Sequence, residues 1–419
     1  MTDISQARNF KRTKYACFYT YLAMSSIFSF PPMLFITFKQ MYGISYTLLG
    51  TLVLINFLTQ LTVDLIFTFF TKLFNVRKVL RVMPLLTTAG LLIYALVPLF
   101  EPKAAYAGFV TGTVIFSIAA GLCEVLLSPV MAAIPSETPE RDMSFLHSLY
   151  AWGVVSVVLI SSVYLAIFGT DNWMYLALFW AALPLGSFIL FSISPMPEMD
   201  LTPASENGSK RRNRGIILCV FCIFLGSAAE NSMTNWISSY VETALGISKA
   251  VGDILGLALF AVLLGLGRTL YAKYGRNILK TLLFGMIGAV ICYTVAGISP
   301  SFIVATVACV LTGLCTSMLW PGTLILMEEK YPAPGVTAYA LMAAGGDFGA
   351  SIAPQMLGIV VDTVAASSLA ASLGEKFSLT PDQIGMKVGM LAAAIFPLIG
   401  IGLLLYMKRY FKREEKSRN

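Results

Sequence analysis

Four acidic side chains interrupt long apolar stretches of this 419-residue chain, at Asp64, Glu124, Glu230 and Asp347. A carboxyl in an apolar surrounding favours its neutral form, so it can load and release a proton, or bind a polar ligand. If the stretches cross a membrane, such costly groups mark by default a path for ions, protons or substrate. The sequence shows no Lys or Arg at the same depth, so we expect no base to neutralise these acids.

Glu124 lies near the middle of its stretch, followed by Ser128 and Pro129. This position favours a role in proton coupling, and the alternative is a protonated Glu that hydrogen-bonds to a neighbouring helix. His147, the only histidine, lies about one turn into the next stretch. Its titration range suits proton relay or gating, and a packing role is the alternative.

Glu230 opens a polar and aromatic stripe. Its members are Glu230, Ser232, Thr234, Asn235, Trp236, Ser239 and Tyr240. Helical spacing places Ser232, Trp236 and Ser239 on one face. A carboxylate and an amide beside a flat ring suit a polyhydroxylated ligand, so the stripe predicts a substrate site. Polar contacts that hold helices together are the alternative.

The other two acids have different surroundings. Asp347 lies in a glycine-rich segment that ends at Pro354, a pattern typical of a helix that bends and packs closely. We expect Asp347 to contact substrate or to cap or bond a neighbouring helix. Asp64 lies next to Gln60 and nearer the cytoplasmic end of its stretch, so we expect a structural or gating role.

The elements that carry these acids are helices in lipid. Hydrophobic residues make up 57% of the chain and charged residues only 12%, too apolar for one soluble core. About 20 helical residues cross a bilayer, and only helices or closed barrels satisfy their backbone groups there. We predict an all-α polytopic membrane protein with twelve transmembrane helices, at 15–38, 46–71, 80–100, 105–134, 143–168, 173–194, 215–242, 251–272, 277–298, 301–327, 335–362 and 384–408.

The basic residues predict the orientation. With both termini in the cytoplasm, all but five of the 29 Lys and Arg lie on the inner side, and the five exceptions are Lys39, Lys103, Lys249, Lys376 and Lys387. This asymmetry matches the positive-inside rule, and anionic lipid explains the net charge of +7 without a nucleic-acid partner. We expect an integral protein of a bacterial inner membrane that works as a monomer.

An internal repeat divides the chain. Gly121-Leu-Cys followed by Pro129 recurs, at the same spacing, as Gly313-Leu-Cys followed by Pro321. Parallel repeats of this kind are typical of transporters built from two halves. We therefore predict two pseudo-symmetric six-helix halves, at 1–194 and 215–419, joined by a cytoplasmic linker at 195–214.

Three motifs resemble the major facilitator superfamily, in its branch of fucose permease and related sugar:proton symporters. Gly121-Leu-Cys-Glu124 with Ser128-Pro129 is similar to that branch's fourth-helix motif, Leu146-His147 with Tyr150 and Gly153 to its fifth, and Glu230 with Trp236 and Tyr240 to its seventh. The resemblance implies the major facilitator fold, proton coupling at Glu124, and a sugar cavity lined by the stretch with Glu230, Trp236 and Tyr240. We expect His147 to act with Glu124 in proton coupling, and Ser128, Asn235 and Asp347 to belong to the substrate site.

The family's cytoplasmic loop motif is degenerate around Arg77 and better kept around Arg268 and Arg276. We expect these three arginines, together with Asp64, to act in gating. Two departures stand out. The first span lacks the acid that fucose permease pairs with its fourth-helix Glu, and Ser128 replaces an Asn, which speaks against fucose itself as the substrate.

The sequence thus predicts a secondary transporter that moves a small polar solute, a sugar, together with H⁺. The alternative is a proton-driven exporter of lipophilic or cationic compounds. We expect no enzymatic activity and no cofactor or metal, because no phosphate-binding GxxxxGK[ST] loop and no second CxxC beside Cys219 and Cys222 is present.

Overall fold

The computed structural model describes residues 10–70, 74–137, 139–197, 210–331 and 336–418. The described residues are helical with no strand, so the predicted all-α membrane fold is confirmed. In the described part of the chain, eleven helices are long and apolar enough to cross a membrane, and a bent helix pair raises this number to as many as twelve.

The chain divides into two compact units, which are described separately. Unit 1 comprises Met1–Ile44 and Ile55–Thr202, and unit 2 comprises Ser45–Leu54 and Pro203–Asn419. The first turns of one helix therefore cluster with unit 2. The predicted half boundaries at 194 and 215 stay a prediction.

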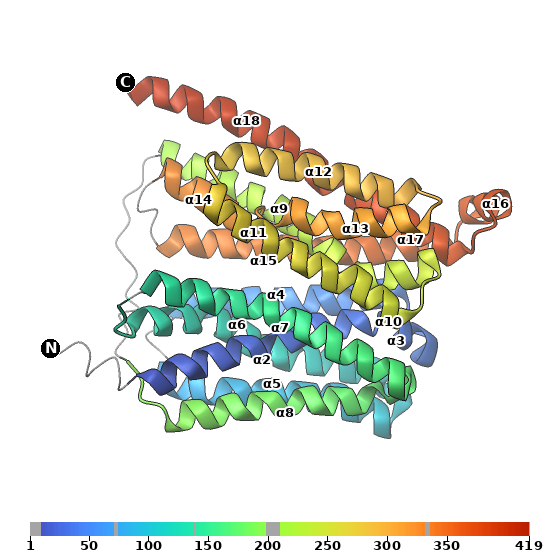
Figure 1. Ribbon diagram of the computed structural model, residues 1–419, viewed down its shortest axis with the longest axis horizontal. Coiled ribbons are helices and arrows are strands. Elements are labelled where there is room, and N and C mark those ends of the chain that lie inside the picture. Colours follow the sequence, from blue (N-terminus) through green and yellow to red (C-terminus); the bar gives the residue numbers. More distant parts are fainter. Residues whose placement is uncertain (1–9, 71–73, 138, 198–209, 332–335, 419) are drawn as a thin grey trace. The chain divides into compact units, whose positions relative to one another are not determined.

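Unit 1 consists of long helices that run side by side (Figure 1). They are α2 (Lys11–Met33), α3 (Phe35–Tyr42), the larger part of α4 (Tyr46–Phe70), α5 (Val76–Phe100), α6 (Ala105–Ala133), α7 (Pro139–Phe168) and α8 (Trp173–Ile193), with single turns η2 (Pro102–Ala104) and η3 (Thr170–Asn172). The first predicted span is the bent pair, since α2 and α3 meet at 50°. Pro31 and Pro32 lie just before that bend, and each removes a backbone donor from the helix.

Aromatic side chains fill one end of unit 1. Phe38 of α3 stacks on Phe109 of α6 with ring centroids 4.2 Å apart, and the Trp173 ring meets Phe38 edge-on at 4.9 Å. Tyr94 of α5 closes the cluster at 4.7 Å from Phe109. Four helices are fixed here by rings that are all fully buried.

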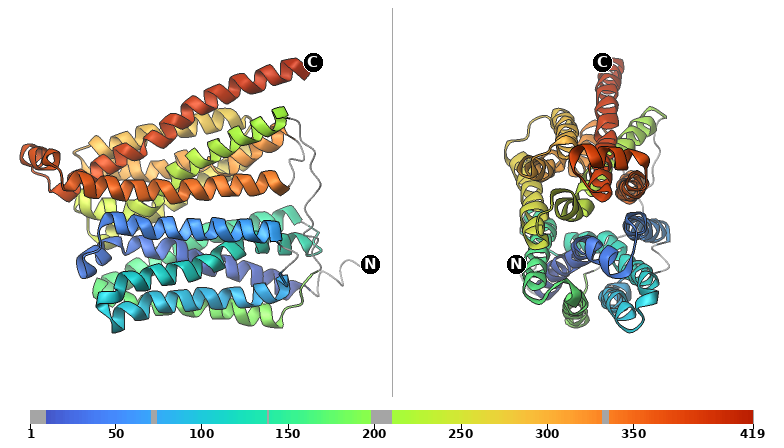
Figure 2. Two further views of the ribbon diagram at one scale, coloured as in Figure 1. Left: turned by 180° about the vertical axis from the view of Figure 1, so that it is seen from behind. Right: turned by 90° about the vertical axis from the view of Figure 1, so that its right-hand side faces the viewer.

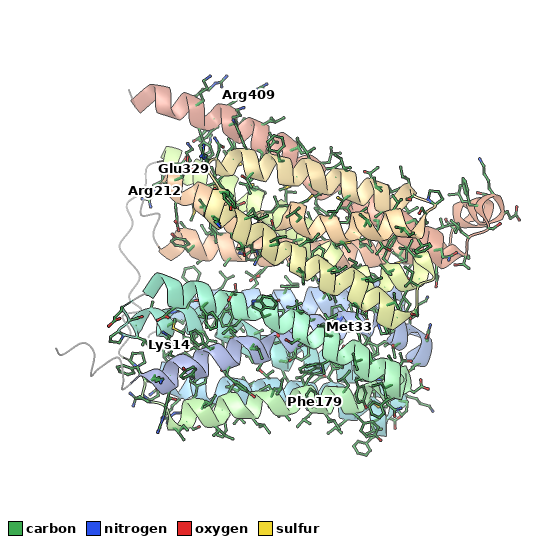
Figure 3. All side chains as sticks on the ribbon, viewed as in Figure 1. Lys14, Met33, Phe179, Arg212, Glu329 and Arg409 are labelled. Carbon is green, nitrogen blue, oxygen red and sulfur yellow. The ribbon has the colours of Figure 1, made fainter. Side chains whose placement is uncertain are left out.

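Unit 2 contains the remaining helices. They are α9 (Lys210–Leu245), α10 (Lys249–Gly252), η4 (Asp253–Ala258), α11 (Leu259–Tyr274), α12 (Ile278–Ile298), α13 (Phe302–Thr316), α14 (Pro321–Lys330), α15 (Val336–Ala365), α16 (Ser368–Phe377), α17 (Pro381–Ala393) and α18 (Ile395–Arg418). The sequence did not predict α16, a ten-residue helix that stands apart at one end of unit 2 (Figure 2). Arg212, Glu329 and Arg409 lie toward the opposite end of this unit (Figure 3).

Asparagine caps start two helices that correspond in the internal repeat. The Asn75 side chain accepts from the backbone N–H of Lys78 at the start of α5, and Asn277 accepts from Lys280 N–H at the start of α12. Each cap satisfies one of the free donors of a helix N-terminus. The two caps give both helices the same local start signal.

The repeat glycines are close-approach points. A Cβ on Gly121 of α6 would lie 3.0 Å from both the Asp64 carboxylate and Val63 of α4. A Cβ on Gly313 of α13 would lie 2.4 Å from the carbonyl oxygen of Phe260 in α11. In both copies of the motif, the glycine lets a neighbouring helix pack against the backbone.

This packing predicts that Gly313→Ala is destabilising, because the new methyl group would meet a backbone atom that cannot move away. Overpacking of this kind costs about 1–3 kcal/mol. Gly265→Ala on α11 is the matched control, since a Cβ there has nothing within 4 Å. Thermal unfolding of both variants in detergent checks the prediction, and equal melting temperatures would contradict it.

Candidate functional site

Two carboxylates meet inside unit 1. Asp64 of α4 is buried, Glu124 of α6 is exposed, and their nearest carboxylate oxygens lie within 4.8 Å of each other. Gly121, one turn before Glu124, allows the approach. The sequence identified both acids and did not predict that they are neighbours, because they lie on different helices.

Polar groups surround Glu124. The Tyr21 phenol of α2 interacts with the Ser128 hydroxyl and lies near the Glu124 carboxylate, and Cys123 and Tyr150 also lie near Tyr21. Tyr21, Ser128 and Tyr150 are half-buried. Glu124 is therefore exposed and has the phenol of a neighbouring helix close by.

The face of α4 that carries Asp64 is polar over two further turns. Gln60 donates to the Asn56 side chain at 3.1 Å, and Ser117 of α6 donates to the same Asn56 oxygen at 2.6 Å. Asn56, Gln60 and Asp64 are spaced four residues apart, so they share one face. This buried row joins α4 to α6 alongside the carboxylates.

In unit 2, Glu230 of α9 has a basic partner. Its Oε1 lies 3.3 Å from Nη2 of Arg268 in α11, and Arg268 Nε donates to the Ser317 carbonyl at 3.0 Å. The expectation that no base reaches the acids is therefore wrong for Glu230. Arg268 lies in the C-terminal half of α11, and its long side chain extends the guanidinium to the carboxylate.

The accessible face of α9 carries Glu230, Asn231 and Thr234, which are half-buried. Asn231 donates to Ser227, and the Thr234 hydroxyl donates to the Glu230 carbonyl. Asn231 was missing from the predicted site, although its spacing of four from Asn235 and from Ser227 was a signal for it.

The opposite face of α9 is packed. Trp236 and Tyr240 are fully buried, and each donates to a backbone carbonyl, Trp236 to Pro354 and Tyr240 to Ala296. Asn235 is buried and donates to the Asn231 carbonyl. Trp236 and Tyr240 therefore support helix packing in this structure, and their predicted contact with substrate stays a prediction.

Asp347 is buried in α15, among glycines that contact α9. A Cβ on Gly349 would lie 2.2 Å from the Phe224 carbonyl, and one on Gly345 would lie 2.7 Å from Val220. The close helix packing expected of this segment is therefore present.

The remaining predicted gating and relay residues lie apart from these acids or outside the described part. Arg77 is exposed at the start of α5, and Arg276 is exposed between α11 and α12. His147 lies in α7, and its side chain is outside the described residues. All seven cysteines, which lie in the described part of the chain, are free thiols.

Long apolar helices with carboxylates on internal polar faces define a membrane transport protein. The sequence matches the Major Facilitator Superfamily over residues 16–354, and the chain belongs to this family. No curated protein sequence matches the chain.

Solved structures share the fold at low sequence identity. A bacterial homolog of the human lysosomal transporter Spinster has a TM-score of 0.72 and 14% identity, covering 96% of this chain and 97% of that one. A D-xylose-proton symporter has a TM-score of 0.69 and 16% identity, with 93% and 97% covered. The fucose:proton symporter FucP of E. coli has a TM-score of 0.57 and 12% identity, with 94% and 99% covered.

The geometry predicts that Trp236→Phe lowers stability, because it removes the donor of a buried hydrogen bond and leaves the Pro354 carbonyl without it. The expected cost is about 1–3 kcal/mol. Trp152→Phe is the control, since Trp152 is 63% exposed. Thermal unfolding in detergent checks this. An unchanged melting temperature together with weakened ligand binding would instead favour the predicted substrate contact.

Proposed function

We propose that the protein is a secondary active transporter that moves a small polar solute, a sugar, by symport with H⁺. The observation that carries the proposal is the Asp64–Glu124 pair, an exposed carboxylate beside a buried one in helices that cross the membrane. The pair places an accessible carboxylate, which can exchange a proton with solvent, beside a second carboxylate.

Glu124 is the proposed proton carrier, because it is the accessible member of the pair. Asp64 takes the place of the missing first-span acid as its companion, in addition to its predicted gating role. Tyr21 and Ser128 supply hydroxyls that can hydrogen-bond to either form of the Glu124 carboxyl. His147 is proposed to relay the proton, on sequence grounds alone.

The proposed substrate site includes the accessible face of α9 in unit 2. Glu230, Asn231 and Thr234 offer charged, amide and hydroxyl groups side by side. Sugars present many hydroxyls, which such groups recognise by directional hydrogen bonds. Ser128, Asn235, Trp236, Tyr240 and Asp347 remain proposed contributors from the sequence. The xylose and fucose symporters that share the fold transport sugars with protons, as their names state.

The transport cycle is proposed to be alternating access by two six-helix halves, residues 1–194 and 215–419, joined by the linker at 195–214. Arg77, Arg268 and Arg276 are proposed to stabilise helix ends in one state of the cycle. Symport requires that the loaded and the empty carrier change state easily while half-loaded forms do not. We propose from the positive-inside pattern that both termini are cytoplasmic. A bacterial inner membrane and a monomeric state stay predictions.

The second candidate is a proton-driven exporter of lipophilic or cationic compounds. The acidic pair of unit 1 favours it, because carboxylates attract cations. The pairing of Glu230 with Arg268 counts against a cation site in unit 2.

The test is uptake of labelled monosaccharides into vesicles with an imposed inward proton gradient. Wild-type protein should accumulate one sugar above its external concentration, and Glu124→Gln should abolish accumulation while exchange down a concentration gradient survives. Asp64→Asn should shift the pH dependence of uptake, because it removes the charge beside Glu124.

Glu101→Gln is the control, since Glu101 is an exposed acid at the end of α5. Driven uptake that stays intact in Glu124→Gln would remove Glu124 from the coupling role. Transport of organic cations with no sugar uptake would favour the exporter.

A further inference from the structure

The Arg268 guanidinium is held in place from two sides. Nε donates to the Ser317 carbonyl at 3.0 Å, and Nη2 donates to Glu230 Oε1 at 3.3 Å. A planar guanidinium fixed by two hydrogen bonds has a defined orientation. Within the described residues, no hydrogen bond occupies its Nη1, which leaves one donor group for another partner.

The Glu230 carboxylate can also accept a further hydrogen bond. Oε1 faces Arg268, while Oε2 is buried and accepts no hydrogen bond within the described part of the chain. Buried polar atoms in proteins usually have a partner, so Oε2 has the capacity to accept a hydrogen bond. A hydroxyl that arrives with a ligand can donate it.

The ion pair is also accessible. The Arg268 side chain is 40% exposed and the Glu230 side chain 14%. The terminal torsion of a Glu side chain is soft, so the carboxylate can rotate to present Oε2. A donor nitrogen of Arg268 and a Glu230 oxygen that rotation can expose therefore lie in one ion pair.

We propose that Glu230 and Arg268 together bind two adjacent hydroxyl groups of a neutral solute, and that this pair, not a single acid, determines the class of substrate. One hydroxyl donates to Glu230 Oε2, and its neighbour accepts from Arg268 Nη1. This inference rests on the proposed function and names its substrate class, a neutral molecule with a vicinal diol.

Charge selects against the other classes. An unpaired carboxylate would favour a cation, and an unpaired guanidinium would favour an anion. Because Glu230 and Arg268 neutralise each other, a cation meets the guanidinium and an anion meets the carboxylate, and both lose part of their hydration. A neutral diol makes both hydrogen bonds without this penalty.

Neighbouring side chains extend the same surface. The half-buried Asn231 donates its amide to Ser227, which leaves its side-chain oxygen as an acceptor, and Thr234 lies one turn beyond Glu230. These groups supply further contacts for a ring that carries several hydroxyls. The set of acceptors and donors matches a sugar better than a molecule with one polar group.

The experiment measures equilibrium binding to purified protein without any proton gradient. The probes are a panel of neutral monosaccharides, the single-deoxy analogues of the tightest binder, glucuronate as an anion and tetraphenylphosphonium as a cation. In wild type, we expect one neutral sugar to bind tightest. Analogues that lack either hydroxyl of one vicinal pair should bind about 10- to 100-fold more weakly, the range for loss of a hydrogen bond to a charged group.

Glu230→Gln and Arg268→Lys separate a binding role from a structural one. Each variant should weaken binding of the parent sugar. In each variant, removal of one of the two hydroxyls should no longer lower the affinity, and a purely structural role would not produce this coupling. Glu242→Gln is the matched control, because Glu242 lies on the same helix and pairs with Lys249 at 3.8 Å. In Glu242→Gln, the single-deoxy analogues should lose as much affinity as they do in wild type.

Three results would overturn the inference. The first is that no neutral diol binds. The second is that the single-deoxy analogues lose the same affinity in both variants as in wild type. The third is that tetraphenylphosphonium binds more tightly than any sugar and that Glu230→Gln weakens its binding. Melting temperatures of the variants identify misfolding, and Arg268→Lys keeps the charge if Glu230→Gln is unstable. Selective diol binding without gradient-driven accumulation would refute proton symport and leave this inference standing.

Discussion

Lipid offers no hydrogen-bond partners, and this constraint explains most of the polar contacts inside each unit. Several buried aromatic side chains donate to backbone carbonyls of neighbouring helices, as Trp236 does to Pro354, Tyr240 to Ala296 and Tyr293 to Ala229. These contacts cross-link α9 to α15 and α12. Against that background, a carboxylate that is exposed, such as Glu124, or half-satisfied, such as Glu230, stands out as a group kept for function.

Close helix approach makes these contacts possible. Glycines at the interfaces let backbones meet at distances that a side chain would forbid, for example Gly313 against Phe260 and Gly349 against Phe224. The same feature brings Asp64 to Glu124, because Gly121 leaves room for the carboxylate. Small residues thus determine the geometry of the acidic pair although they carry no chemistry themselves.

The sequence predicted the helical membrane fold well, because long apolar runs directly indicate segments that lie in lipid. It found the carboxylates, since an acid in an apolar run is conspicuous. It could not find the Asp64–Glu124 approach or the Glu230–Arg268 pair, which depend on packing between helices. Helical periodicity also grouped Ser232, Trp236 and Ser239 correctly on one face, yet it does not tell which face of α9 is buried. That face is packed, and the accessible one carries Asn231.

The two copies of the internal repeat are alike in sequence and different in mechanics. In the first copy, α6 continues through Pro129 as one helix of 29 residues. In the second, the α-helix is interrupted by a short turn between α13 and α14, and Pro321 begins the new helix. A break of this kind concentrates bending at one place, whereas a continuous helix spreads it along its length. The two copies would therefore differ in stiffness. Helix α6 would move as one rigid body, whereas α13 and α14 could change the angle between their axes at residues 317–320.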